Sequence, residues 1–279
     1  MKKKQYLLLS FALCGLLAFT ACSGDNTEKP AEAESAEAAQ GEADQTDIAE
    51  MMIGKWMITE RSGQPALTNE KSAFTFTSPT KAYISASFNA RPELGTPWME
   101  LLEADVAVSG NTVTITRNLG EDAATVDELT ISDITDTETQ GSLIVKSMED
   151  GDETIVSEET IRLTKINDDF SEDILGTWEG RCTSEGSAFD DGQEHRWEYK
   201  ADGTYVYYVK DGDDWIPGDD TLNEYFVDGN LLCTRWSDDS TEYREWWEIV
   251  IDGDTMTWTA LRADEDGNPF TASFEMHKV

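Results

Sequence analysis

The chain has 279 residues, with 57 Asp or Glu against 21 Lys or Arg, so its formal charge at pH 7 is −36. This charge excludes nucleic acid as an expected partner, because binding to phosphates depends on Lys and Arg side chains. The length predicts two domains rather than one. An apolar content of 39% and nine Trp residues are enough for packed cores, which excludes disorder of the whole chain.

The N-terminal segment has the pattern of a secretion signal. Three lysines, Lys2–Lys4, precede an apolar run, Leu7–Ala21, that is too short for a permanent membrane-spanning helix. The run ends in Phe19-Thr20-Ala21-Cys22, which resembles the lipobox of bacterial lipoproteins. The resemblance implies cleavage of residues 1–21, lipidation of Cys22 and anchoring in the outer membrane, at the cell surface or, as the alternative, facing the periplasm. An ordinary signal peptide that contains Cys22 is the competing interpretation.

An acidic tether and an internal repeat follow the signal. Residues 22–46 are rich in Ala, Glu, Gly, Asp and Gln and contain almost no large apolar residue, which predicts a flexible segment. Beyond it, Ile53-Gly54-Lys55-Trp56 reappears as Leu175-Gly176-Thr177-Trp178, with an offset of 122 residues. The repeat predicts two domains of the same fold, residues 47–167 and 168–279.

Each repeat is expected to open with a short helical turn, because Asp47 and Glu50, like Asp169 and Glu172, have capping-box spacing. After it, apolar residues alternate with Thr, or Asp-Gly pairs separate short β-prone runs, which predicts strands joined by hairpins. The clearest expected strands are Phe74–Phe76, Thr112–Thr116 and Leu129–Ile131, then Tyr205–Val209, Tyr225–Val227, Leu231–Trp236 and Thr255–Leu261. About eight strands per repeat predict an all-β fold of two tandem antiparallel up-and-down barrels, since closure removes exposed sheet edges.

The Gly-x-Trp motif links the repeats to a known family. Its two copies, Gly54–Trp56 and Gly176–Trp178, each follow the expected helical turn and precede the meander. This arrangement resembles the lipocalin-like domains of the calycin group, particularly those in lipoproteins of Bacteroidota, and it covers nearly the whole chain after the tether. The resemblance implies that each Trp plugs the closed end of its barrel under an Arg from a late strand. Arg162 is the implied partner of the first Trp, and Arg262 that of the second.

Few residues point to catalysis or to a bound cofactor. His195 and His277 are the only imidazoles, and neither has the surroundings of a nucleophile–base pair, so the chain is expected not to be an enzyme and to need no cofactor. The Asp-rich stretches 211–214, 238–239 and 264–268 lack EF-hand spacing. Solvated turns are therefore favoured over calcium sites, and no metal site is predicted.

Two cysteines remain once the signal peptide and Cys22 are set aside. Cys182 and Cys233 both lie in the second repeat, and the exported compartment permits disulfides. They either bond to each other or remain as two buried thiols in neighbouring strands. The sequence leaves both interpretations open, because it gives no Cα separation.

Aromatic residues accumulate in the second repeat, which holds seven of the nine Trp residues. A packed core has little use for so many indoles and phenols, since each carries a polar atom that needs a partner when buried. We expect a site for a small apolar or aromatic ligand at the open end of the second barrel, lined by Trp215, with Tyr207 and Trp247 as neighbours. The alternatives are rings that only fill the core, and a structural or interaction module with filled barrels that binds a protein or a glycan. Nothing in the sequence sets the oligomeric state.

Overall fold

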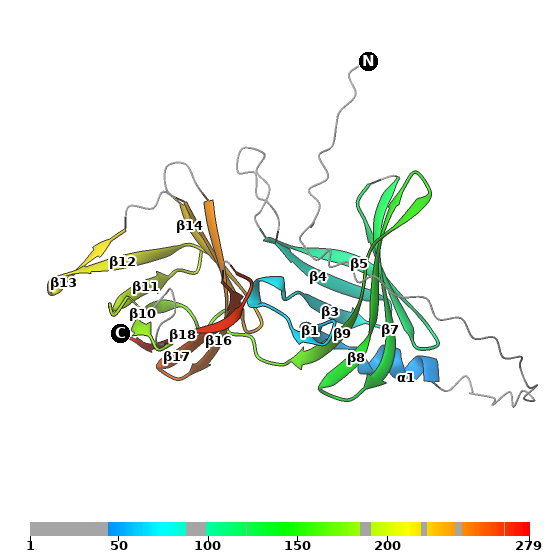
Figure 1. Cartoon of the computed structure of the whole chain (residues 1–279), viewed down its shortest axis with the longest axis horizontal. Coiled ribbons are helices and arrows are strands. Elements are labelled where there is room, and N and C mark those ends of the chain that lie inside the picture. The colour runs from blue at the N-terminus through cyan, green and yellow to red at the C-terminus, as the bar shows by residue number, and fades with distance from the viewer. Residues whose placement is uncertain are drawn as a thin grey trace, which may run out of the picture. The chain divides into compact units, whose positions relative to one another are not determined.

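The computed structural model describes residues 44–87, 99–120, 122–184, 191–218, 222–237, 242–264 and 266–279. The expected signal peptide, Cys22 and the tether up to residue 43 lie outside the described residues. Residues Gly41–Val279 form one compact unit. Their described strands make two antiparallel sheets of nine strands each (Figure 1), which confirms the predicted all-β class.

The first sheet closes into a barrel. Its elements are α1 (Asp44–Met51), β1 (Gly54–Arg61), β2 (Gln64–Pro65), the short helix η1 (Thr68–Glu70), β3 (Ala73–Ser78), β4 (Lys81–Ser87), β5 (Met99–Ser109), β6 (Thr112–Asn118), β7 (Ala123–Ile134), β8 (Glu138–Glu149) and β9 (Asp152–Ile166). Strand β1 pairs with both β3 and β9, so the meander returns to its start, while β2 only extends β1.

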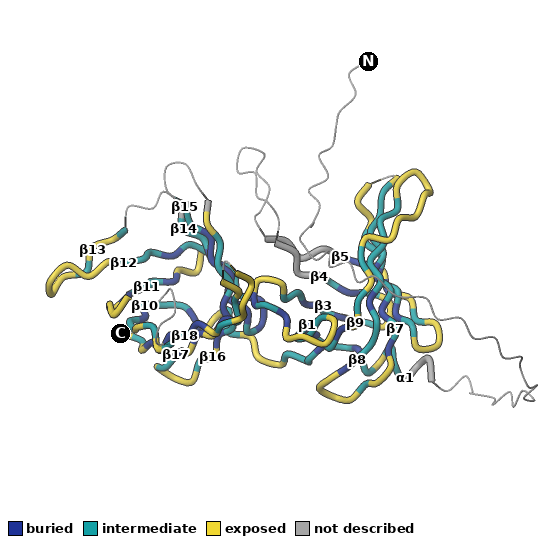
Figure 2. Tube along the Cα trace, viewed as in Figure 1, coloured by how far each residue is buried: buried dark blue, intermediate teal, exposed yellow. Residues whose placement is uncertain are grey.

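The interior of the first barrel is occupied by its own side chains. Val113 and Ile115 on β6 are buried, as are Leu129 and Ile131 on β7, and they alternate with more exposed Thr residues, as expected for a sheet with one face in water. Figure 2 shows buried and less buried stretches along the strands of this sheet. The same inward positions also carry an ion pair, in which Arg117 donates to Asp127 at 3.1 Å. Burial raises the pKa of Asp127, and the Arg117 guanidinium offsets part of that rise.

The second sheet curls in the same way but closes less completely. Its strands are β10 (Gly176–Cys182), β11 (His195–Tyr199), β12 (Tyr205–Asp211), β13 (Asp214–Pro217), β14 (Leu222–Asp228), β15 (Leu231–Ser237), β16 (Glu242–Asp252), β17 (Thr255–Ala263) and β18 (Pro269–Lys278). The first strand of this sheet, β10, pairs with its last strand, β18, as β1 pairs with β9 in the first barrel. No ladder joins β12 to β14 in the described part of the sheet: an isolated bridge links Thr204, just before β12, to Glu224, and β12 pairs with β13 instead.

The predicted strands and hairpins fall within observed ones, and each Asp-Gly turn places its glycine at positive φ, for example +67° at Gly229. The expected helical turns differ between the repeats. The first is part of helix α1, which already begins at Asp44. The second is a hydrogen-bonded turn in which the Ile174 N–H donates to the Phe170 carbonyl at 3.1 Å. The division into domains 47–167 and 168–279 stays a prediction.

Trp56 and Trp178 occupy equivalent, fully buried positions, each with 0% of its surface exposed. The Trp56 Nε1–H donates to the Met52 carbonyl, and the Trp178 Nε1–H donates to the Ile174 carbonyl, both at 2.7 Å. Each indole is therefore packed into the barrel and hydrogen-bonded to the turn that precedes its strand.

The cation above each of these rings is a lysine, which corrects the arginine partners implied by the family resemblance. Lys165 Nζ lies 5.2 Å from the ring centroid of Trp56, and Lys278 Nζ lies 5.0 Å from that of Trp178. The register of the closing strands is the reason, since it sets Lys165 opposite Trp56 and Lys278 opposite Trp178. Arg162 stands opposite Glu60, which it contacts at 3.0 Å.

The glycine of the Gly-x-Trp motif makes room for this lysine. Gly54 has φ +123° and Gly176 has φ +117°, a region that side-chain-bearing residues rarely adopt. A Cβ at Gly54 would lie 2.6 Å from Lys165 Cε, and one at Gly176 would lie 3.0 Å from Lys278 Cε. The motif thus combines a buried indole, a glycine in a conformation that other residues rarely adopt, and space for the lysine that covers the ring.

Trp178→Ala should lower the free energy of unfolding by about 3–5 kcal/mol, because it empties a fully buried site. Native domains hold only about 5–15 kcal/mol in total, so the second sheet should unfold partly or wholly. Trp178→Phe, which keeps a ring but loses the N–H, should cost less. Chemical denaturation followed by circular dichroism measures both, with Trp215→Ala, at a partly exposed position, as the control. An unchanged transition for Trp178→Ala would contradict the plug role.

Candidate functional site

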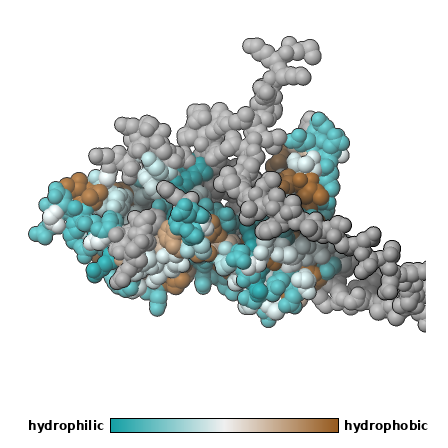
Figure 3. Space-filling model, viewed as in Figure 1, coloured by the Kyte–Doolittle hydropathy of each residue, from teal (hydrophilic) through white to brown (hydrophobic). Residues whose placement is uncertain are grey.

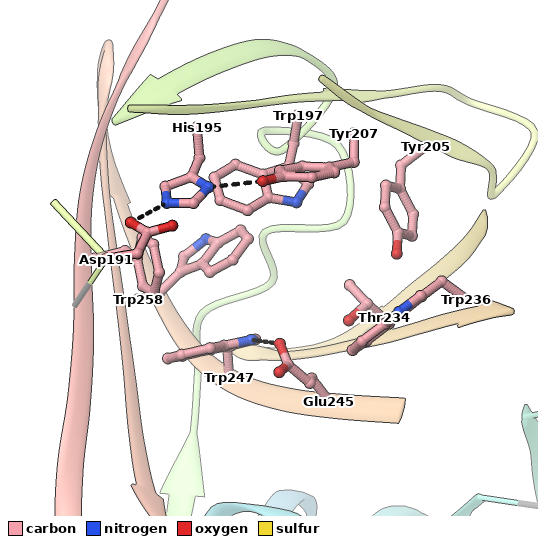
Figure 4. Close-up of a pocket in the computed structure, with 11 residues that line it drawn as sticks. Asp191, His195, Trp197, Tyr205, Tyr207, Thr234, Trp236, Glu245, Trp247 and Trp258 are labelled. Atoms are coloured by element: carbon pink, nitrogen blue, oxygen red, sulfur yellow. Dashed lines mark hydrogen bonds and ion pairs between the residues drawn. The ribbon is translucent and has the colours of Figure 1, made fainter. Parts of the chain in front are cut away.

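A cavity of about 390 Å³ lies inside the second sheet and is partly open to solvent. Its wall comes from alternate residues of β11, β12, β15 and β16, because alternate side chains of a strand point to the same face. Single residues of β17, β18 and the segment before β11 complete it. The lining residues are Asp191, His195, Trp197, Tyr205, Tyr207, Thr234, Trp236, Glu245, Trp247, Trp258 and Phe274 (Figure 4).

Rings in mutual contact form one side of the cavity. The centroids of Trp197 and Trp258 are 4.9 Å apart, and those of Trp247 and Trp258 are 5.4 Å apart. Phe274 meets Trp247 edge to face, with centroids 5.4 Å apart and ring planes at 85°. Such packing fixes the rings relative to one another, so the wall does not have to be rebuilt around a ligand.

His195 is held by hydrogen bonds on both ring nitrogens. Its Nδ1 lies 2.9 Å from the Tyr207 hydroxyl, and its Nε2 lies 3.2 Å from Asp191 Oδ1 (Figure 4). Burial raises the pKa of Asp191, but the Gln193 N–H and His195 outweigh this effect and leave the pKa below its ordinary value. With both nitrogens engaged, the imidazole positions Tyr207 rather than presenting an unoccupied base.

Glu245 brings a carboxylate to the opposite wall. Its Oε2 accepts a hydrogen bond from Trp247 Nε1 at 3.1 Å and lies 3.9 Å from Arg262 Nη2. Burial raises the pKa of Glu245, and Arg262 together with the Trp247 N–H offsets only part of the rise. The Arg262 guanidinium lies 4.5 Å from the centroid of the Trp247 ring. This contact replaces the expected stacking of Arg262 on Trp178.

The three residues expected to contact a ligand are not brought together. Tyr207 and Trp247 line the cavity, whereas Trp215 does not. Trp215 stands opposite Lys210 of β12. Lys210 and Tyr207 point to opposite faces of the sheet, so Trp215 lies on the outer face. Arg196 and Lys210 cover it there, at 4.6 Å and 5.1 Å from the ring centroid. Ligand contact by Tyr207 and Trp247 stays a prediction.

Sequence reasoning overlooked most of the lining. Eight of the eleven lining residues, Tyr207 and Trp247 among them, share a simple signal, a pair of polar or aromatic residues two positions apart on one strand. These pairs are His195 and Trp197, Tyr205 and Tyr207, Thr234 and Trp236, and Glu245 and Trp247. Four such pairs on strands that face one another would have indicated a polar, aromatic interior.

Cys182 and Cys233 are not bonded to each other. Cys182 is on β10, whose neighbours are β11 and β18, whereas Cys233 is on β15, between β14 and β16. Cys233 also points away from the cavity, because it alternates with the lining residue Thr234. The thiol of Cys233 is buried, which raises its pKa well above the ordinary value. The expectation of two thiols on neighbouring strands is therefore also wrong, since three strands separate them.

One Asp-rich stretch serves its own turn, and another, residues 238–239, lies outside the described residues. Asp264 Oδ1 accepts hydrogen bonds from the backbone N–H groups of Asp266 and Asn268, at 3.0 Å and 2.8 Å. In the described part of the chain, no three His, Cys, Asp or Glu side chains gather as a metal site. No helix within those same ranges has the length and apolar character needed to cross a bilayer.

No protein-family model matches the sequence, and no curated protein matches it. Among solved structures, a DUF3598-family protein of unknown function from Nostoc punctiforme PCC 73102 is 10% identical, with 84% of this chain and 99% of that chain covered and a TM-score of 0.25. Intact Ap-TbpB, with its N and C lobes, is 10% identical, with 75% and 54% covered and a TM-score of 0.21. This chain thus spans about half of that structure. TM-scores of this size assign neither a family nor a function, so the lipocalin-like resemblance stays a prediction.

Glu245→Gln should change how stability depends on pH. Above the ordinary carboxyl pKa of 4.5 and below the raised value, the folded protein holds a proton that the unfolded chain has released. The free energy of unfolding of the wild type should therefore fall, relative to Glu245→Gln, as the pH rises through this window. Denaturation at a series of pH values measures the difference. Glu275→Gln, at an exposed position on β18, should show no such trend; a trend equal to that of Glu245→Gln would contradict the assignment.

Proposed function

We propose that the second sheet of this protein binds a small apolar or aromatic ligand in the cavity between β11, β12, β15 and β16. The observation that carries the proposal is the lining itself, in which seven of the eleven residues are Phe, Tyr or Trp. Its volume of about 390 Å³ is within the range of small-molecule sites, about 300–1,000 Å³. A few polar groups, among them Glu245 and His195, are placed to orient a ligand.

An interaction module is the second candidate, favoured by apolar side chains on the outside. Val209 and Ile216 are 50% and 48% exposed and stand opposite each other on the β12–β13 hairpin. Figure 3 shows apolar surface near this hairpin and again over the first sheet, where Ile155 and Val156 are each 57% exposed. These patches are small, and single exposed apolar residues are common on protein surfaces. The hollow, ring-lined interior therefore favours ligand binding.

Titration of the mature chain with the neutral fluorescent probe N-phenyl-1-naphthylamine tests the binding function. The wild type should bind with an increase in probe fluorescence, and Trp197→Leu should weaken binding about tenfold by removing one wall of the cavity. Trp215→Leu is the matched control, since this ring lies on the outer face, and it should leave the affinity unchanged. Absence of binding by the wild type, or an equal loss in both variants, would contradict the proposal; thermal unfolding verifies that each variant is folded.

The protein is further proposed to be a lipoprotein held in the outer membrane through Cys22, with its folded part at the cell surface. Support comes from the sequence alone: the apolar run before Cys22, the acidic tether after it, and a stretch, Ser23–Asn26, similar to the export signal of Bacteroidota lipoproteins. At a charge of −36 the chain would not adhere to an anionic membrane by itself. Acyl chains would supply the attachment, at about 0.8 kcal/mol per buried CH₂.

Cys22→Ala should leave the protein as an unprocessed precursor or release it from the membrane fraction. Cys14→Ala, a substitution inside the segment that is removed, is the matched control and should still give an anchored protein. Detergent phase partition with mass spectrometry of the N-terminal peptide distinguishes these results, and protease treatment of intact cells reports surface exposure. Attachment of the Cys22→Ala protein equal to that of the wild type would contradict the anchor.

A further inference from the structure

The cavity contains a hydrogen-bond donor that the protein does not use. Trp258 is 2% exposed, its ring lines the cavity, and its Nε1 has no hydrogen-bond partner among the described residues. The equivalent group of Trp247 donates to Glu245, and that of Trp178 donates to a backbone carbonyl. A buried donor without a partner destabilises the folded protein. The N–H itself is covered, so a ligand acceptor would recover that energy once neighbouring side chains shift enough to open the N–H to the cavity.

Apart from His195, which is bonded to Asp191, the ionisable side chains with a low pKa in the wall are carboxyl groups. Glu245 and Asp191 contribute carboxylates, whereas no Lys or Arg occurs among the described residues that line the cavity. Arg262 Nη2 lies 3.9 Å from Glu245, and its guanidinium is stacked on Trp247 and is not part of the lining. Burial raises the pKa of Glu245, and a cation bound beside the carboxyl group would lower that pKa again by favouring the charged form.

The aromatic rings of the wall also favour a positively charged ligand. The face of an indole or phenol carries negative charge density, so a cage of such faces attracts a cation, most strongly where water is excluded. Trp197, Trp247 and Trp258 form a contiguous group here, with tyrosines on the β12 side. A chain charge of −36 also concentrates cations near the protein.

We propose that the ligand is a small aromatic ammonium compound that also carries a hydrogen-bond acceptor, with the ammonium group at Glu245 and the acceptor at the Trp258 N–H. This inference rests on the proposed function and narrows it from any apolar or aromatic molecule to one chemical class. A neutral sugar could stack on the same rings and use the same polar atoms. Its binding would depend on hydrogen bonding to Glu245 but not on a positive charge in the ligand.

Three related probes separate these contributions in calorimetric titrations of the mature chain. Tyramine has both the ammonium group and a phenolic oxygen, 4-ethylphenol lacks the charge, and 2-phenylethylamine lacks the oxygen. Tyramine should bind about tenfold more tightly than either of the others. Glu245→Gln should weaken tyramine and phenylethylamine about tenfold and leave 4-ethylphenol unchanged. Trp258→Phe should weaken tyramine and 4-ethylphenol but not phenylethylamine.

Glu245→Asp is the second variant, because it keeps the charge and should keep the preference for tyramine over 4-ethylphenol. The inference is overturned if 4-ethylphenol binds as tightly as tyramine, if Glu245→Gln weakens all three probes equally, or if glucose or cellobiose binds more tightly than tyramine. Binding of N-phenyl-1-naphthylamine together with any of these results would leave the proposed function standing. Loss of naphthylamine binding as well would remove both proposals.

Discussion

Pairing of the first strand with the last strand is the constraint on which each repeat depends. It places a lysine of the last strand opposite the Trp of the first, in β1 and β9 and again in β10 and β18. The residue two positions before the Trp has no side chain, which leaves space for the end of the lysine. The indole N–H then bonds to the preceding turn, so one small motif joins strand closure, core packing and the entry of the chain into the sheet.

The repeats share this constraint and differ where β12 turns back on itself. In the first barrel, β4 and β5 pair from Lys81 opposite Asp105 to Ser87 opposite Met99. In the second sheet, β12 forms a hairpin with β13, and an isolated bridge just before β12 links the chain to β14. The first interior holds mostly aliphatic residues, with Trp56, Phe74, Phe76 and an ion pair, whereas the second encloses a cavity among rings. The two sheets therefore differ in the pairing at one edge and in their inward side chains, and these differences accompany the cavity in the second sheet.

The sequence supported much of the fold but little of the site. Alternation with Thr and the Asp-Gly turns located the strands, because both signals are local. Trp215 was misplaced because it belongs to a short hairpin whose register puts it on the outer face, beside Arg196. The cation on Trp178 was misassigned for a similar reason, since only the register of β10 with β18 shows that Lys278, and not Arg262, stands there.

By itself the sequence determined the all-β class, the internal repeat and the buried role of Gly-x-Trp, because period, spacing and composition are properties of neighbouring residues. Only the tertiary structure decided which inward rings meet, that Cys182 and Cys233 stay apart, and that Glu245 and the Trp258 N–H line the same cavity. These facts depend on strand order and on register, where a shift of one residue exchanges the two faces of a strand. Contacts between distant segments set them, and no local pattern records those contacts.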